Sequence, residues 1–187
     1  MGPGRAPVSA EDAALRLLLE MLDRLGIEYF VGGSVASASH GLARSTIDVD
    51  VIARIQPSHA EPLAAALGSD FYLDAEAAAD SISRGRSFNI IHKPTAYKFD
   101  VFPALDDAYH LGQFERARDR RLATAEDILL EKLLWYRAGG EVSERQWNDV
   151  RGIRDVQGER LDRGYLARWA EYLGVADLLD RLMTERE

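Results

Sequence analysis

The sequence predicts an α+β fold in which helices flank a mixed β-sheet and a helical subdomain follows. Short apolar runs with strand-like alternation occur at 46–54, 88–92 and 97–102, and segments with helical spacing of leucine and alanine lie before and between them. From Thr124 onward only helical patterns remain. We therefore expect a disordered lead-in at residues 1–8, an α/β core at 9–123 and a helical subdomain at 124–187 that packs on the core, because no flexible linker divides the two.

Composition places the chain among globular proteins. Its 187 residues are 47% hydrophobic and 29% charged, which is enough for a sizeable core. The formal net charge of −8 does not attract nucleic acid to the molecule as a whole, although a local basic patch would. The absence of cysteine excludes disulfides and thiolate zinc sites. No apolar run approaches the ~18 residues of a membrane span, and the N-terminus lacks the apolar centre of a signal peptide, so we expect a cytoplasmic protein with no membrane partner.

The first helix is expected to begin at a capping box, Ser9-Ala-Glu-Asp12, and to stop at Gly26. A strand at 27–31 then runs into the turn Gly32-Gly33-Ser34, and a short helix rich in alanine and serine follows. Such a turn exposes backbone N–H groups at a helix N-terminus, where a phosphate binds. The alternative is an ordinary strand–helix connection.

Two acids lie inside the next strand, at 46–54. Asp48 and Asp50 alternate with apolar residues, so both side chains leave the same face, roughly 6–7 Å apart. Carboxylates this close repel each other and are costly to bury unless a cation joins them. The pattern predicts a cation at this face, and the alternative for the pair alone is a solvated strand face.

A third acid lies farther along the α/β core. Two alternating runs joined by a four-residue turn at 93–96 predict a β-hairpin. Asp100 lies in its second arm between two apolar residues, where a parallel or mixed sheet would place it beside Asp48 and Asp50. Between the Asp-x-Asp strand and the hairpin we expect, in order, a helix at 57–67, a strand at 71–73 and a helix at 74–82 capped by Asp74.

Arginines alternate after the hairpin. Arg116, Arg118 and Arg120 would share one face of a strand at 114–122. That face is either a solvated edge that opposes aggregation or a surface that contacts phosphate. The arginines of the 116–121 cluster would suit an RNA acceptor.

The C-terminal part predicts four successive helices. A second capping box, Thr124-Ala-Glu-Asp127, opens the first, which ends at Gly139. Further helices are expected at 143–157, 162–173 and 176–183. Core packing is expected for Trp135, Trp147 and Trp169, and surface positions without metal-ligand spacing are expected for His40, His59, His92 and His110.

Together these features suit phosphate chemistry. Three carboxylates with room for waters and phosphate oxygens suit Mg²⁺ or Mn²⁺. Two such ions clamp the attacking and leaving oxygens of an in-line displacement at phosphorus. The Gly-Gly-Ser turn, one short helix upstream of the Asp-x-Asp strand, would hold a triphosphate. The order of these parts favours a functional interpretation over the alternative for each part alone.

This order resembles the nucleotidyltransferase superfamily with the polymerase-β-like fold. Gly33-Ser34 matches its Gly-Ser motif, Asp48-Val-Asp50 its Asp-x-Asp motif and Asp100 its third acid. The run Arg44-Ser-Thr-Ile-Asp-Val-Asp50 is similar to minimal bacterial members related to the AbiEii toxins of type IV toxin–antitoxin systems. Lys132 and Asp149 match a lysine and an aspartate on successive helices of that family, and the resemblance covers about residues 27–156.

The resemblance implies transfer of a nucleoside monophosphate from an NTP to an acceptor hydroxyl, with pyrophosphate leaving. Asp48 and Asp50 would hold the metal ions, and Asp100 would complete one of them and act as general base. Lys132 is either a solvated surface charge or an inward phosphate ligand, and Arg44 either neutralises phosphate or caps the strand. The implied nucleotide-binding residues are Gly32, Gly33, Ser34, Arg44, Lys132 and Asp149.

The acceptor stays open at the level of sequence. Candidates are an RNA such as tRNA, a protein or a small molecule, and the toxin resemblance implies a cognate antitoxin as a partner. The alternative function is a non-catalytic binding or regulatory protein that retains the fold.

Overall fold

A computed structural model describes residues 10–40 and 48–185 of the chain. The predicted lead-in at 1–8 and the Ser9 cap lie outside the described residues. The chain divides into two compact units, the first comprising Met1–Tyr29 and Ile47–Leu105 and the second Phe30–Thr46 and Asp106–Glu187. The second unit thus begins inside the first strand, Tyr29–Val31, and resumes at Asp106, whereas the sequence pattern placed the start of the helical part at Thr124.

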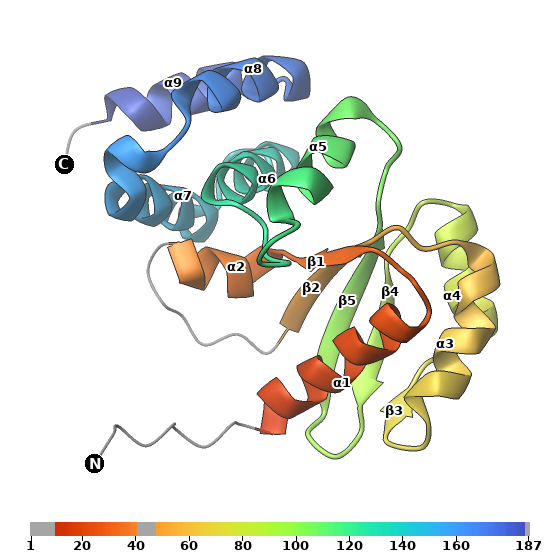
Figure 1. Cartoon of the computed structure of the whole chain (residues 1–187). Coiled ribbons are helices and arrows are strands. Elements are labelled where there is room, and N and C mark those ends of the chain that lie inside the picture. Colours follow the sequence, from red (N-terminus) through yellow and green to blue (C-terminus); the bar gives the residue numbers. More distant parts are fainter. Residues whose placement is uncertain (1–9, 41–47, 186–187) are drawn as a thin grey trace, which may run out of the picture. The chain divides into compact units, whose positions relative to one another are not determined.

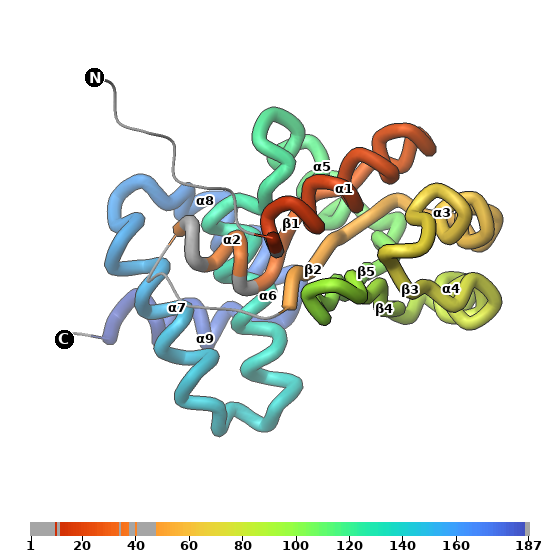
Figure 2. The backbone as a smooth tube through the Cα atoms, turned by 90° about the horizontal axis from the view of Figure 1, so that it is seen from below, coloured from red at the N-terminus to blue at the C-terminus, as the bar shows by residue number. Residues whose placement is uncertain are grey.

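Five strands form one mixed sheet in the order β1-β2-β5-β4-β3 (Figures 1 and 2). β2 and β5 are parallel, whereas β4 runs antiparallel to both β5 and β3. The α+β class and the β4–β5 hairpin are thereby confirmed. The strands are β1 Tyr29–Val31, β2 Asp48–Ala53, β3 Phe71–Tyr72, β4 Phe88–His92 and β5 Tyr97–Pro103.

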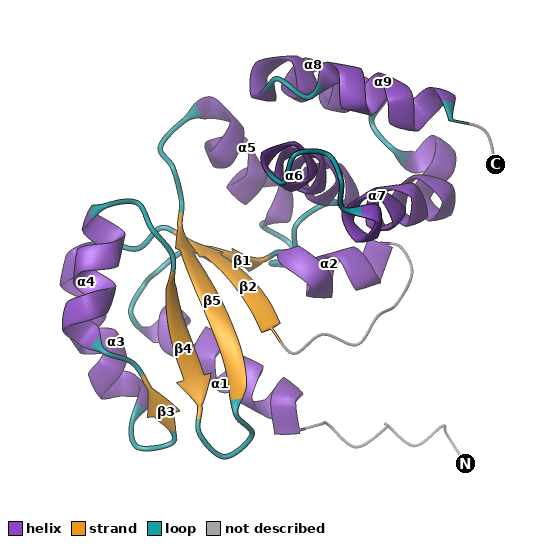
Figure 3. Ribbon diagram, turned by 180° about the vertical axis from the view of Figure 1, so that it is seen from behind, coloured by secondary structure: helices purple, strands orange, loops and turns teal. Residues whose placement is uncertain are grey.

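Helices of the first unit cover one face of its strands. α1 contacts β5 and α3, and α4 contacts α3 and β4; α1 passes in front of β5 in Figure 1 and behind it in Figure 3. Alternate strand residues are buried toward this core, among them Val49, Val51, Phe99 and Val101. The intervening residues therefore leave the opposite face. The helical elements are α1 Ala10–Arg24, η1 Pro57–His59, α3 Ala60–Leu67 and α4 Ala75–Ser83, the last N-capped by Asp74 as predicted.

The second unit is a helical bundle built around α6. This helix contacts α2, α7 and α8, and α9 packs on α7 and α8. Its core includes Leu129, Leu133, Ile153 and Leu166. Within the described ranges, no helix is long and apolar enough to cross a membrane. The helical elements are α2 Gly33–His40, α5 Ala108–Ala117, α6 Ala125–Ala138, α7 Glu144–Gln157, η2 Gly158–Arg160, α8 Arg163–Leu173 and α9 Ala176–Thr184.

The strand expected at 114–122 is wrong. Asp107 caps α5 by accepting from the N–H groups of Tyr109 and His110, and α5 continues to Ala117. The buried residues of α5 are Tyr109, Gln113 and Ala117, which recur every four residues as one helical face requires. Helix burial therefore overrides the alternation of arginines that suggested a strand.

Candidate active site

The register of β2 and β5 aligns the predicted acids. Asp50 lies directly opposite Asp100, and Asp48 lies directly opposite Lys98. Because side chains alternate along each strand, all four leave the same face of the sheet, away from the buried valines. The expectation that a parallel pair of strands places Asp100 beside the Asp-x-Asp pair is confirmed. We call Asp48, Asp50, Lys98 and Asp100 the acid face.

Lys98 lies between two of the carboxylates. Its Nζ is 3.0 Å from Oδ2 of Asp100 and 3.7 Å from Oδ1 of Asp48. The hydrogen bond to Asp100, reinforced by the charges of both acids, raises the pKa of the Lys98 ammonium above its usual value. Sequence reasoning missed this residue, although its position two before Asp100 in an alternating strand places it on the same face.

The acid face has the donor chemistry of a divalent-cation site. Carboxylate oxygens from two adjacent strands, with the rest supplied by water and phosphate, are the ligands that Mg²⁺ and Mn²⁺ use. A positive group already lies against Asp48 and Asp100. In the part of the chain that the structure describes, however, no three His, Asp or Glu side chains are arranged to hold a metal ion as they stand. The carboxylates of the acid face are therefore of the chemical type that binds Mg²⁺ or Mn²⁺, and the Lys98 ammonium lies beside two of them.

The Gly-Gly-Ser turn lies where β1 ends and α2 begins. Gly33 has φ of 56°, a left-handed conformation that glycine adopts without strain. Gly32 is buried, and its carbonyl accepts from the N–H of Ala36 in the first turn. These glycines belong to the second unit and the acid face to the first. Their joint action on one nucleotide stays a prediction, as do the roles of Ser34, whose side chain is not described, and Arg44, which lies outside the described residues.

Lys132 and Asp149 are brought together by α6 and α7. The Lys132 Nζ lies 2.7 Å from Oδ2 of Asp149, and Lys132 is buried. Of the two alternatives for Lys132, the inward position is therefore correct. A buried ammonium needs an anionic partner, and Asp149 supplies it.

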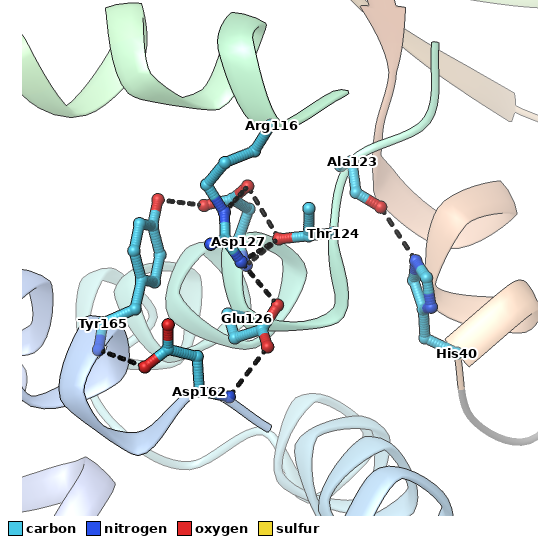
Figure 4. A network of polar contacts seen from close by, with 8 residues as sticks. All are labelled: His40, Arg116, Ala123, Thr124, Glu126, Asp127, Asp162 and Tyr165. Carbon is cyan, nitrogen blue, oxygen red and sulfur yellow. Dashed lines mark hydrogen bonds and ion pairs between the residues drawn. The ribbon is translucent and has the colours of Figure 1, made fainter. Parts of the chain in front are cut away.

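Arg116 belongs to a buried polar network rather than to a phosphate-binding strand (Figure 4). Its guanidinium lies 2.7 Å from Glu126 and 3.7 Å from Asp127, and it stacks 3.8 Å from the centre of the Tyr165 ring. The hydroxyl groups of Thr124 and Tyr165 both donate to Asp127. We call Arg116, Thr124, Glu126, Asp127 and Tyr165 the α6 network, and it ties α5 and α8 to the start of α6.

Two of the expectations for aromatic residues were wrong. Trp135 is 59% exposed on α6, whereas Trp147 and Trp169 are buried as predicted. His92 is buried rather than at the surface, with its ring 4.9 Å from that of Phe71 and its Nδ1 2.8 Å from the hydroxyl of Thr95. Both errors arise because a residue's strand or helix face becomes buried only when another element packs on it.

Comparison with known proteins identifies the fold. No protein-family model matches the chain, and no curated protein sequence matches it. The solution structure of the antibiotic-resistance factor ANT(2'')-Ia is similar, with a TM-score of 0.52 over 90% of this chain and 91% of that one, at 16% identity.

This is the nucleotidyltransferase fold. The mixed sheet and its flanking helices are the features of that fold expected from the sequence. The similarity spans both units of the chain, since it covers 90% of it.

Proposed function

We propose that this protein transfers a nucleoside monophosphate from an NTP to an acceptor hydroxyl, releasing pyrophosphate. The observation that carries the proposal is the β2–β5 register, in which Asp50 lies opposite Asp100 and Asp48 shares their face. Three carboxylates gathered on one face of the sheet repel each other unless a cation joins them. The nucleotidyltransferase fold supports the same chemistry.

Each candidate residue has a role in this proposal. Asp48, Asp50 and Asp100 would hold Mg²⁺ or Mn²⁺, which when bound neutralises phosphate charge. Asp100 would accept the proton of the acceptor hydroxyl. Binding and orientation of the triphosphate would fall to Gly32, Gly33, Ser34, Arg44 and Lys132, with Asp149 positioning the Lys132 ammonium through their ion pair.

Charge favours a cationic small molecule as acceptor. The net charge of −8 attracts cations to the molecule as a whole and repels RNA. Arg116, part of the cluster that would suit RNA, is occupied by Glu126 and Asp127. The structurally similar ANT(2'')-Ia is an aminoglycoside nucleotidyltransferase, and aminoglycosides carry several ammonium groups.

A non-catalytic role is the second candidate, and one observation favours it. Lys98 neutralises part of the acid face without any metal ion. In a chain that had lost catalysis while retaining the fold, such ion pairs would balance the charge of the acids in place of a metal ion. In that case the protein would act by binding, and removal of the acids would change stability rather than activity.

Label transfer tests the proposal. The protein is incubated with Mg²⁺ and each α-labelled NTP, alone or with an aminoglycoside panel, total tRNA or a cell lysate, beside the Asp48→Ala/Asp50→Ala double variant. We expect label on an aminoglycoside-like acceptor and none with the double variant. Label on tRNA or a protein would redirect the acceptor, and growth arrest relieved by a neighbouring gene product would then support the toxin function. Absence of both label transfer and metal-dependent NTP binding would leave the non-catalytic role.

A further inference from the structure

Among the described residues of the β2–β5 register, Lys98 is the one basic residue on the acid face. It pairs with Asp48 across the strands and precedes Asp100 by two residues on the same strand. Its ammonium is within ion-pair distance of both carboxylates, at 3.7 Å and 3.0 Å. The lysine is therefore held by the geometry of two parallel strands rather than by a flexible loop.

The ammonium and a divalent cation would need the same oxygens. Mg²⁺ binds carboxylate oxygens at about 2.1 Å in a nearly octahedral arrangement. An ammonium bonded to the same oxygens adds a like charge within a few ångströms of the metal, and like charges at that separation repel strongly. Occupation by one therefore opposes occupation by the other.

The ion pairs are also easy to exchange. The side chains of Lys98, Asp48 and Asp100 are 35%, 51% and 19% exposed, so water reaches all three and can take the place of the ammonium. The four-carbon stem of lysine is flexible, which lets the ammonium turn away while the strand stays in place. Nothing in the packing of β2 and β5 has to move.

We propose that Lys98 is an internal counter-cation that competes with the divalent metal ion for Asp48 and Asp100, so that metal loading requires its ammonium to leave. This inference rests on the proposed function, since it concerns regulation of the same site. Once displaced, the ammonium finds its natural new partner in an NTP phosphate. Metal and nucleotide then bind cooperatively, each favouring the released state of Lys98.

Mn²⁺ binding to the purified protein, followed by electron paramagnetic resonance, tests the competition without measuring catalysis. We expect Lys98→Met to bind Mn²⁺ about tenfold more tightly than wild type, because a like charge is removed from beside the metal. Lys98→Arg keeps the charge and should bind as wild type does. Lys93→Met, at an exposed lysine in the β4–β5 turn, makes the same change in net charge away from the acid face and should leave the affinity unchanged.

A second titration tests the cooperativity. A non-hydrolysable NTP analogue should raise the Mn²⁺ affinity of wild type more than that of Lys98→Met. Thermal unfolding checks that each variant folds, and Lys98→Gln, which keeps a polar head, replaces Lys98→Met if the latter does not.

The outcomes separate the two proposals. Equal or weaker Mn²⁺ binding by the uncharged variants overturns the counter-cation and leaves the metal site standing. Absence of Mn²⁺ binding by wild type and all variants overturns the metal-dependent function itself. Tighter Mn²⁺ binding by Lys98→Met than by wild type, Lys98→Arg or Lys93→Met supports the counter-cation. Loss of that tighter binding when Asp50→Asn is added supports the metal site as well.

Discussion

Carboxylates and cations meet in both units of this protein, but in opposite surroundings. On the acid face, the Asp48 and Lys98 side chains are 51% and 35% exposed. In the α6 network, the side chains of Asp127 and Glu126 are only 1% and 11% exposed. Exposed pairs contribute little stability and exchange partners readily, whereas breaking a buried pair leaves an uncompensated charge.

This difference in exposure distinguishes a structural cluster, the α6 network, from a candidate binding site, the acid face. Asp127 accepts hydrogen bonds from two hydroxyl groups and lies beside Arg116, and Glu126 accepts from Arg116 and from the backbone of Asp162. These acids are fully engaged by side chains and backbone of their own unit. On the acid face, Asp48 and Lys98 are instead open to solvent, so an incoming cation can take the place of the Lys98 ammonium there.

Among the substitutions considered, Asp50→Asn should have the largest effect, a loss of activity without a loss of stability. Removing a group that helps stabilise charge at the reacting phosphate should lower label transfer by about 10²–10³-fold. The unfolding free energy should stay close to that of wild type, because Asp50 is not fully buried. Asp70→Asn, in the exposed turn before β3, is the matched control and should retain full activity. If Asp50→Asn instead unfolded the protein, the acid face would be a stabilising cluster like the α6 network rather than a site.

Arg116→Met should cost about 3 kcal/mol of unfolding free energy, measured by urea denaturation. The substitution leaves two buried carboxylates without their cation. Arg54→Met is the matched control, because Arg54 pairs with Glu28 at 2.7 Å on the exposed surface, and it should cost less than about 1 kcal/mol. Similar costs for the two variants would contradict the contrast between the buried and exposed pairs.

The defect of Arg116→Met should depend on pH. Burial raises the pKa of Asp127 above the 3.8 that is usual for an aspartate, and the Arg116 charge counteracts part of this rise. A raised folded-state pKa means that the native state binds more protons, so this group's contribution to stability is lost as pH increases through that pKa. Without Arg116 the pKa rises further. The stability difference between variant and wild type should therefore be small below pH 3.8 and grow toward neutrality.

Urea midpoints measured across this range check the pH dependence. The hydrogen bonds that Tyr165 and Thr124 donate to Asp127 also lower its pKa, whereas the like charge of Glu126 raises it. Arg54→Met should show a nearly constant difference from wild type. A constant difference for Arg116→Met as well would mean that Asp127 does not titrate in this range.

Lys98→Met should have the smallest effect on stability in metal-free buffer, less than about 1 kcal/mol by urea denaturation. The lysine is partly exposed and its carboxylate partners can be solvated in its absence. A loss as large as that of Arg116→Met would show that the acid face is held together by Lys98 as the α6 network is by Arg116. The comparison between site and scaffold would then fail.

Local chemistry made much of the first unit predictable. The hairpin, the Asp-x-Asp strand and the Asp74 cap depend on neighbours within a few residues, and all three are present. The Thr124 cap of α6 is likewise local and was found. Helix capping and strand alternation depend on residues that are close in the sequence, so both can be predicted from a single sequence.

Segments with two competing local patterns were not predictable. The arginines at 116–120 alternate like a strand, while Tyr109, Gln113 and Ala117 recur like a helix. The helix prevails because its apolar face is buried against other helices of the second unit, as the 5.3 Å contact between Tyr109 of α5 and Trp169 of α8 illustrates. Trp135 shows the reverse case, since no described element covers its face of α6 enough to bury it.

The sequence by itself determined that three acids occupy otherwise apolar strands and that a Gly-Gly-Ser turn precedes two of them. The tertiary structure alone decided which residues face which. The parallel pairing of β2 with β5 set Asp50 opposite Asp100 and brought Lys98 to Asp48, and the packing of α7 on α6 turned Lys132 inward to Asp149. Register and helix contact join residues far apart in the chain through backbone hydrogen bonds and burial, and no local pattern encodes them.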